Sequence, residues 1–339
     1  MIITFMVGNG LDISLGLKTK YTDFYEYYFN KKKNVKNDIM KSINNDFELW
    51  ANLEKRLGEY TSRINSNEKE IDKFYDDKYD LDCELRKYLR KEQEKIDWNN
   101  ENNINNVKKN FLSCLTNFYH NFSEVDREDI ESVISNEQRY YRLISFNYTN
   151  VIQKCSELSE SNLIETLYIH GTLEGEKTIL GVNDSEQIEN VEFRNNQEML
   201  VSMCKLNIND FYGNKVKVKA QNILLRSGVI CIFGMSLGET DKYWWNIIVN
   251  GLFNDNIQRI IIFHYEPELN LDFNVRVLRT QNKIKEQLLS YSNLSDNEKE
   301  LIKDKIKVIC NKNIFDLNLE LKDDNNSEKV RNERQLVMS

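Results

Sequence analysis

The stretch MIITFMVGNGLDIS (residues 1–14) decides the fold. Met1–Val7 is apolar apart from Thr4, which is typical of a strand buried on both faces in a parallel sheet. The segment Gly8-Asn9-Gly10 then interrupts this run, and glycines at such a point allow either a tight turn or a close approach to a phosphate. The dinucleotide fingerprint G-x-G-x-x-G needs a third glycine at position 13, which is Ile13. The stretch therefore predicts either a nucleotide site of another kind or a plain turn.

Further strand candidates alternate with helical patterns along the chain. The predicted strands are 141–146, 165–169, 178–182, 228–233, 258–264 and 306–310. The predicted helices between them are 150–159, 185–213 and 241–253, and Ser295 with Glu298 forms a capping box for a helix that extends to about residue 303. This alternation predicts an α/β fold, a doubly wound, mainly parallel Rossmann-like sheet with helices on both faces.

Residues 31–138 interrupt the alternation with a polar, helical pattern. Apolar side chains recur at helical spacing, namely Phe47, Trp50, Leu53, Leu57 and Tyr60. Residues 67–95 and 107–122 are further helix candidates, and the asparagine-rich stretch 99–106 is predicted to be a loop. Because strands resume afterwards, we interpret 1–321 as one domain with 31–138 as a helical insertion, and 322–339 as a flexible tail.

Composition restricts the function classes. The chain has 54 acidic and 46 basic residues and a formal charge of -8, which argues against a protein that coats nucleic acid. It has neither an apolar run long enough for a membrane span nor a signal peptide, so we expect a cytoplasmic protein. The six cysteines form no C-x-x-C pair and the three histidines no H-x-x-x-H pair, so we expect reduced thiols and no metal.

The ends of the predicted strands carry the polar residues. In parallel sheets, ligands bind at the carboxyl ends of strands, so these residues are predicted to converge on one cleft. The strand ends carry Gly8–Asp12, Asn147–Asn150, His170-Gly171, Gly234–Asp241 and His264.

Several of these residues allow two interpretations. Asp12 is either a ligand contact or a helix N-cap. An amide such as Asn147 suits the orientation of a water or ribose hydroxyl, whereas Asn150 fits a capping role better. His170 is either a general base or a structural histidine.

The segment Gly234–Asp241 also has alternatives. Ser236 is a candidate phosphate contact, and Asp241 is either an N-cap or a ribose contact. Gly234-Met-Ser236-Leu-Gly238 also matches the nucleophile elbow of serine hydrolases, for which only His264 lies downstream. The aromatic residues at 243–245 favour a core position over an adenine platform.

Four motifs together resemble the AbiH family of bacterial abortive-infection proteins. They are NGLDISLGLKTKYTDF (9–24), SFNYTN (145–150), IHG (169–171) and GMSLGETD (234–241), and the segment Trp50–Gly58 adds to the likeness. The same points, in the same order, are similar to the glycine-rich, Asn, His-Gly and G-x-S loops of the sirtuin-like fold. The likeness departs at Asn9, where sirtuins have alanine, and at Asp12, where they have serine.

The resemblance implies an antiphage effector that binds NAD and hydrolyses its nicotinamide–ribose bond, with Asn147 and His170 as catalytic residues. Deacetylation is disfavoured because the four-cysteine zinc module is missing. The cofactor-binding residues expected on this basis are Gly8, Asn9, Gly10, Asp12, Thr19, Gly171, Gly234, Ser236, Asp241 and His264.

Two other functions stay open. One is a non-catalytic sensor of NAD or ADP-ribose, and the other is a metal-dependent hydrolase or nuclease that uses Asp12. The expected partners are a nucleotide ligand, further copies of this chain and a phage-derived trigger. We expect neither a membrane nor a specific nucleic acid as a partner.

Overall fold

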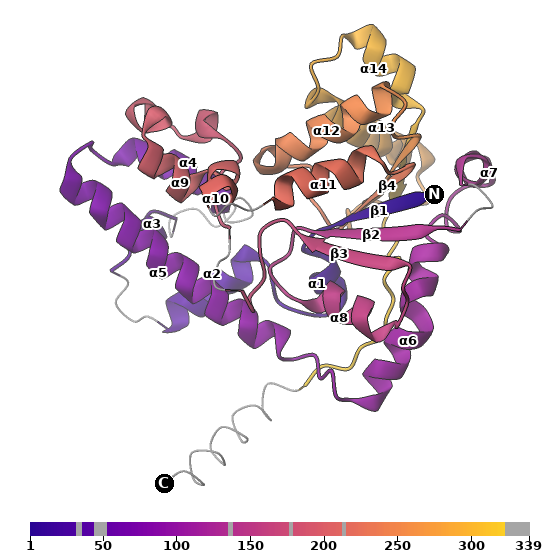
Figure 1. Cartoon of the computed structure of the whole chain (residues 1–339), viewed down its shortest axis with the longest axis horizontal. Helices are drawn as coiled ribbons and strands as arrows, with labels where there is room; N and C mark the ends of the chain where they lie inside the picture. The colour runs from indigo at the N-terminus through magenta and orange to yellow at the C-terminus, as the bar shows by residue number, and fades with distance from the viewer. Residues whose placement is uncertain (32–35, 44–52, 135–137, 176–178, 212–214, 323–339) are drawn as a thin grey trace.

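Six parallel strands form the centre of the molecule. The computed structural model describes residues 1–31, 36–43, 53–134, 138–175, 179–211 and 215–322. The strands are β1 (Ile2–Val7), β2 (Tyr140–Ser145), β3 (Ile164–Tyr168), β4 (Val229–Phe233), β5 (Arg259–His264) and β6 (Ile306–Cys310). Their order in the sheet is β3-β2-β1-β4-β5-β6 (Figure 1). The predicted Rossmann-like α/β fold is therefore confirmed.

Strand β1 lies at the centre of this sheet. It pairs with β2 on one side and β4 on the other, and Val7 is level with Ser145 and with Phe233. The carboxyl ends of the three strands consequently lie side by side. The strand order reverses direction at this point, and such a switch point is where open α/β sheets bind ligands.

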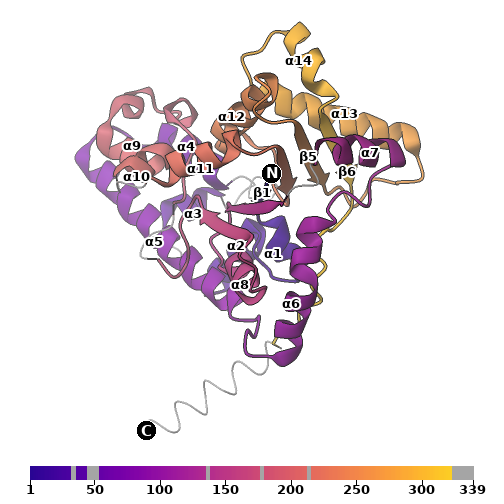
Figure 2. The same ribbon diagram turned by 45° about the vertical axis from the view of Figure 1, so that its right-hand side comes forward.

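Helices cover both faces of the sheet (Figure 2). One face carries α1 (Gly10–Ser14), α6 (Glu101–Thr116), α7 (Glu124–Val133) and α8 (Val151–Leu158). The other carries α11 (Val216–Leu225), α12 (Lys242–Phe253), α13 (Asn274–Ser290) and α14 (Asp296–Lys303). Alternate side chains of β1 pack into the apolar cores on the two faces of the sheet. Phe5 and Val7 lie on the α1 side and Met6 lies on the α12 side.

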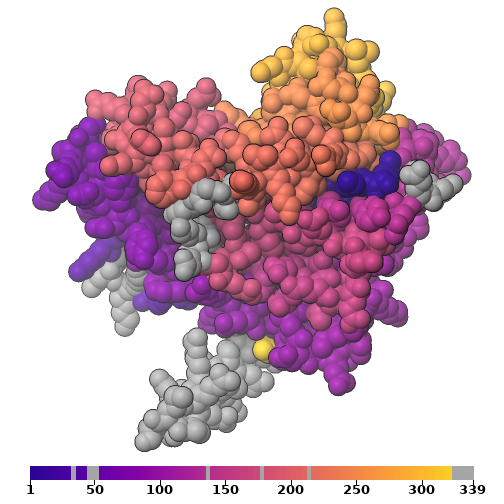
Figure 3. Space-filling model, in the orientation of Figure 1, coloured from indigo at the N-terminus to yellow at the C-terminus, as the bar shows by residue number. Residues whose placement is uncertain are grey.

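A further group of helices lies beside the sheet and has its own apolar core. It comprises α2 (Tyr21–Lys31), α3 (Asp38–Ile43), α4 (Leu53–Tyr60), α5 (Glu68–Gln93) and α9 (Gln197–Met203), and also α10 (Lys205–Phe211), which packs against α9. We call this group the helical layer. Phe24, Leu57 and Phe74 are buried in its core. In the space-filling view a hollow separates α9 and α10 from α13 and α14 (Figure 3).

The predicted insertion 31–138 contributes to two of these cores. Its helices α3–α5 belong to the helical layer, whereas α6 and α7 pack under the sheet. The boundaries of a single domain at 1–321 stay a prediction. Phe47 and Trp50 of the predicted amphipathic helix, and all of the predicted tail except residue 322, lie outside the described residues.

Three sequence predictions about elements are wrong. Residues 179–182 form no strand, and Val182 makes only an isolated bridge to Cys204. The asparagine-rich stretch is not a loop, because Asn100 accepts from two backbone N–H groups and so caps α6, which begins at Glu101. The predicted helix 185–213 is divided into the short 3-10 helices η3 (Ser185–Gln187) and η4 (Val191–Asn195) followed by α9 and α10.

Within the described residues, no helix combines the length and apolar character that crossing a membrane requires. All six cysteines are free thiols, as the sequence predicts.

Candidate functional site

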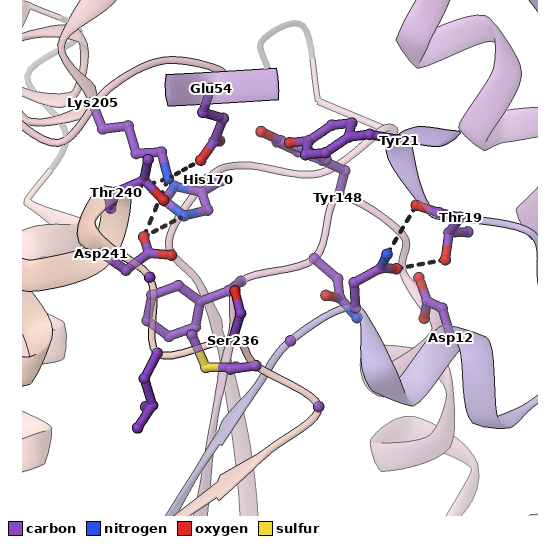
Figure 4. A pocket seen from close by; sticks show the side chains of 18 of the residues that line it. Asp12, Thr19, Tyr21, Glu54, Tyr148, His170, Lys205, Ser236, Thr240 and Asp241 are labelled. Carbon is purple, nitrogen blue, oxygen red and sulfur yellow. Dashed lines mark hydrogen bonds and ion pairs between the residues drawn. The ribbon is translucent and has the colours of Figure 1, made fainter. Parts of the chain in front are cut away.

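A cavity of about 540 Å³ lies at the carboxyl ends of the central strands (Figure 4). Its walls come from the segments that follow β1, β2, β3 and β4, and from α2, α4, α5, α10 and α13. The volume is within the range of about 300–1,000 Å³ that is usual for small-molecule sites. Nine residues singled out from the sequence line it: Gly8, Asn9, Asp12, Thr19, Asn147, His170, Gly234, Ser236 and Asp241.

The glycines of the first loop pack against the loop after β4. Gly10 N donates to Gly234 O at 2.8 Å, and Gly8 N donates to Phe233 O at 2.9 Å. A Cβ atom on Gly10 would lie 2.3 Å from Gly234 Cα, and Gly234 has a φ of +66°. Only glycine fits such a close approach of two backbones.

This packing corrects the expected phosphate site. Gly10 does not line the cavity, and its N–H is already bonded to Gly234. The N–H of Gly8 is likewise used in the sheet, so neither group is available for a phosphate.

Asn9 and Thr19 hold each other. Asn9 Nδ2 donates to Thr19 O at 2.9 Å, and Thr19 Oγ1 donates to Asn9 Oδ1. Both line the cavity, yet these groups are engaged with each other. Their observed role is to fix the segment between α1 and α2 against the first loop.

Asp12 is a buried carboxyl group inside α1. The N-cap position of this helix is Asn9, so the N-cap interpretation of Asp12 is wrong. Thr149 Oγ1 donates to Asp12 Oδ2 at 2.7 Å. Burial raises the pKa of Asp12 to about 7, although Thr149 and the nearby Asn147 amide act in the opposite direction. Within the described residues, Asp12 Oδ1 has no hydrogen-bond partner.

The loop after β2 supplies an amide to the same cavity. Asn147 is buried, and its Nδ2 has no hydrogen-bond partner among the residues that the structure describes. Asn150 occupies the N-cap position of α8, but its side chain donates to Glu174 and makes no cap. The predicted position of Asn150 is therefore correct and its predicted capping bond is wrong.

His170 lies between two aromatic rings. Its ring centroid is 5.5 Å from that of Phe146 and 6.3 Å from that of Tyr148. His170 Nε2 is 3.6 Å from Asp241 Oδ1, while His170 Nδ1 has no partner in the described parts of the chain. The imidazole thus faces a carboxylate on one side and has an unbonded nitrogen on the other.

Behind His170 lies a buried group of charges that the sequence analysis missed. Lys205 Nζ is 2.8 Å from Glu54 Oε2 and 3.2 Å from Asp241 Oδ1. Burial opposes ionisation of Asp241, but Lys205 and His170 hold its pKa below the ordinary value. Burial likewise opposes the charge on Lys205, yet Asp241 and Glu54 keep its pKa raised. The only sequence feature that pointed to Glu54 was its position in the family-like segment 50–58. No sequence feature pointed to Lys205.

Two tyrosines lie between this charged group and Asp12 (Figure 4). Burial raises the pKa of Tyr21 and of Tyr148 well above the ordinary value, and the Glu54 and Asp241 carboxylates add to both shifts. Tyr148 donates to Ile179 O at 2.9 Å. Both phenols are therefore neutral at physiological pH.

The loop after β4 is held by three side chains. Trp245 Nε1 donates to Gly238 O at 2.9 Å, while Gln287 Nε2 and Tyr291 Oη donate to Leu237 O at 2.7 and 2.8 Å. Trp245 and the neighbouring Trp244 are buried in the core, as the sequence favours.

This loop gives no support to the nucleophile-elbow interpretation. Ser236 is exposed in a non-helical loop, and no hydrogen bond joins it to a histidine within the described residues. His264 lies outside the cavity, with Nε2 3.3 Å from Glu266 Oε2. Gly171 also lies outside the lining and has a φ of +74°, so its observed role is in the turn that places His170. Asp241 is at the N-cap position of α12, but its side chain makes no cap.

Among the described residues, no group of three or more His, Cys, Asp or Glu side chains is arranged to hold a metal ion. The lining instead combines amide, imidazole, carboxyl and phenol groups. Such a set suits recognition of a polar organic ligand by hydrogen bonds.

Comparison with known proteins places the chain in a family. The family model described as "Bacteriophage abortive infection AbiH" matches residues 4–265, which include most of β1, all of β2 to β5, and the segments that carry Asp12, Asn147, His170 and Asp241. No curated protein matches the chain. On the extent of the family match, the chain belongs to the AbiH family of bacteriophage abortive-infection proteins.

Proposed function

We propose that this protein acts in phage abortive infection by binding NAD and hydrolysing the nicotinamide–ribose bond. The AbiH family supports the abortive-infection role. One observation carries the enzymatic part: Asn147 Nδ2, His170 Nδ1 and Asp12 Oδ1 are buried atoms without partners in the described residues, and their side chains line one cavity. The likeness of the four strand-end loops to sirtuin-like domains supports the choice of NAD.

The proposed reaction breaks the bond between C1′ of the ribose and the nicotinamide nitrogen. Nicotinamide leaves with the bonding electron pair, and positive charge develops on the ribose ring. Water then bonds to C1′ and gives up a proton to His170, which acts as general base. Asn147 holds the water or a ribose hydroxyl by its amide, and the carboxylates around the cavity stabilise the developing cation.

The test is release of free nicotinamide and ADP-ribose from NAD by the purified protein, with and without a chelator. We expect release that the chelator does not affect. Loss of a general base typically costs about 10²–10⁴ in rate, and we expect this loss for His170→Ala. His264→Ala is the matched control, because His264 lies outside the cavity and should leave the rate unchanged. Full activity of His170→Ala would overturn the assignment of the base.

A nucleotide sensor is the second candidate. The cavity is lined both by strand-end loops and by Tyr21, Glu54 and Lys205 from the helical layer, so a bound ligand would contact both parts of the molecule. This geometry suits a ligand-controlled assembly of several copies in response to a phage-derived trigger. Calorimetric binding of NAD without release of nicotinamide would favour the sensor, and activity that a chelator abolishes would favour a metal-dependent hydrolase.

A further inference from the structure

The charges around the cavity are mainly negative. The charged residues in its lining are Asp12, Glu54, Lys55, Lys205, Glu239 and Asp241. Lys205 is paired with Glu54 and Asp241, and Lys55 Nζ lies 3.5 Å from Glu239 Oε2. No arginine is present among the described lining residues. The two lysines are therefore already balanced by carboxylates.

Two backbone donors of the first loop do not compensate for this balance. Phosphates in Rossmann-like sites are usually held by N–H groups of the glycine-rich loop and by a helix N-terminus. Here the N–H groups of Gly8 and Gly10 are bonded to β4 and its loop, and α1 has only five residues. A diphosphate in the buried part of the cavity would face carboxylates without a free cation.

The unbonded polar atoms have a different chemistry. Asn147 Nδ2 donates, whereas Asp12 Oδ1 and His170 Nδ1 each accept or donate according to where the proton lies. Ribose hydroxyl groups both donate and accept, so they match this set. A pyridinium ring is a planar cation, which the carboxylates and the Tyr21 and Tyr148 rings would attract.

We propose that the cavity recognises the ribosyl-pyridinium part of its substrate and does not recognise phosphate, so that nicotinamide riboside is itself cleaved. This inference rests on the proposed hydrolysis. The phosphates of NAD would lie at the exposed edge, which is formed by Lys55, Ser236 and Glu239. The chemistry is the same for each substrate: the C1′–N bond breaks, nicotinamide keeps the electron pair, and water supplies the new C1′–O bond.

The experiment compares kcat/KM for NAD, nicotinamide mononucleotide and nicotinamide riboside with the full chain. A charge-assisted hydrogen bond contributes about 1.5–3 kcal/mol, so each lost phosphate contact would lower kcat/KM by roughly 10- to 150-fold. We expect the three values to agree within about tenfold, and pyrophosphate not to compete. The proposal would be overturned if the protein cleaved NAD but not nicotinamide riboside. Competitive inhibition by pyrophosphate would overturn it as well.

A variant provides a second measurement. At pH 8, where Asp12 is mainly ionised, Asp12→Asn makes the cavity less negative, so the ratio of kcat/KM for NAD over that for nicotinamide riboside should rise. Asp296→Asn is the control, because it removes an equal charge from an exposed side chain and should leave the ratio unchanged. An equal ratio in both variants would contradict the electrostatic argument.

The experiments distinguish a failure of this proposal from a failure of the proposed hydrolysis. If no substrate releases nicotinamide, hydrolysis is wrong, and calorimetry then measures binding of NAD and of nicotinamide riboside. Similar affinities would still support recognition of the ribosyl-pyridinium part. Binding of NAD alone would show that phosphates are recognised and would overturn the inference.

Discussion

The ammonium group of Lys205 lies 2.8 Å from the carboxylate of Glu54, and both side chains are buried. Glu54 belongs to α4 and Lys205 to α10, whereas Asp241, the second partner of Lys205, precedes α12. Because Asp241 also faces His170, these charges connect the helical layer with the proposed general base. The pair therefore has a structural role and a positioning role at once.

Removal of Lys205 should destabilise the protein strongly. In Lys205→Met, the Glu54 and Asp241 carboxylates stay buried without their cation, and breaking a buried pair in this way typically costs about 3–5 kcal/mol. Urea unfolding monitored by circular dichroism measures this change. Lys55→Met is the matched control, because the Lys55 side chain is 48% exposed and its pair with Glu239 should contribute less than about 1 kcal/mol. Equal stability of the two variants would contradict the buried network.

The contribution of Asp12 to the stability of the protein should fall as pH rises toward 7. Burial raises the pKa of Asp12 from 3.8 to about 7, so between these values the folded chain holds a proton that the unfolded chain releases. The contribution of Asp12 to the free energy of unfolding then decreases by up to about 4 kcal/mol over this interval.

Asp12→Asn should remove most of this pH dependence. Urea unfolding at pH 5 and at pH 8 measures how much the free energy of unfolding decreases between the two. This decrease should be smaller in Asp12→Asn than in the original protein by about 3 kcal/mol. Asp296→Asn, at an exposed position, should show the original decrease. Parallel pH curves for all three proteins would show that Asp12 titrates near its ordinary value.

The contact of Gly10 with Gly234 should make position 10 intolerant of any side chain. An added Cβ would lie 2.3 Å from Gly234 Cα, so Gly10→Ala must push the two loops apart. Such overpacking typically costs about 1–3 kcal/mol, measurable as a lower melting temperature. Gly238→Ala is the control in the same region, since its nearest atoms would be at 3.6 Å, an ordinary contact. A normal melting temperature for Gly10→Ala would contradict the observed packing.

The cysteines should show two classes of reactivity. Cys155, Cys204, Cys231 and Cys310 are buried, and burial raises the pKa of each thiol. In the folded protein, a thiol reagent that needs the thiolate should therefore label Cys83 first and leave the four buried thiols unlabelled. Cys114 should react more slowly than Cys83, because burial raises the pKa of Cys114 to about 11. Unfolding in urea should expose all six. Rapid labelling of Cys231 in the folded state would contradict its place in the central strand.

The sequence predicted the sheet because its signals are local. The central strands β1, β4 and β5 are short, largely apolar runs, and β2 and β3 are short runs in which apolar and polar residues are mixed. Polar residues or glycine follow these strands. The convergence of Asp12, Asn147, His170 and Asp241 on one cavity followed from the general rule for parallel sheets. Their chemical roles remain predictions.

The parts that the sequence could not predict depend on contacts between distant segments. Lys205 is 151 positions from Glu54 in sequence numbering, and no local pattern marks a lysine whose charge is balanced in the interior. The glycines of the first loop suggested a phosphate site, whereas their partner is the backbone of Gly234. Asn100 and its neighbours suggested a loop, because asparagine is common both in loops and at the N-caps of helices.

The side chains that hold the loop after β4 also bear on how this protein can be shortened. The family match ends at residue 265, yet Gln287 and Tyr291, which donate to Leu237 O, lie beyond it. A fragment that ends at residue 265 would keep only Trp245 of the three side chains that hold this loop. It would also lose β6 from the edge of the sheet. The smallest unit that retains the cavity wall therefore extends well past the segment by which the family is recognised.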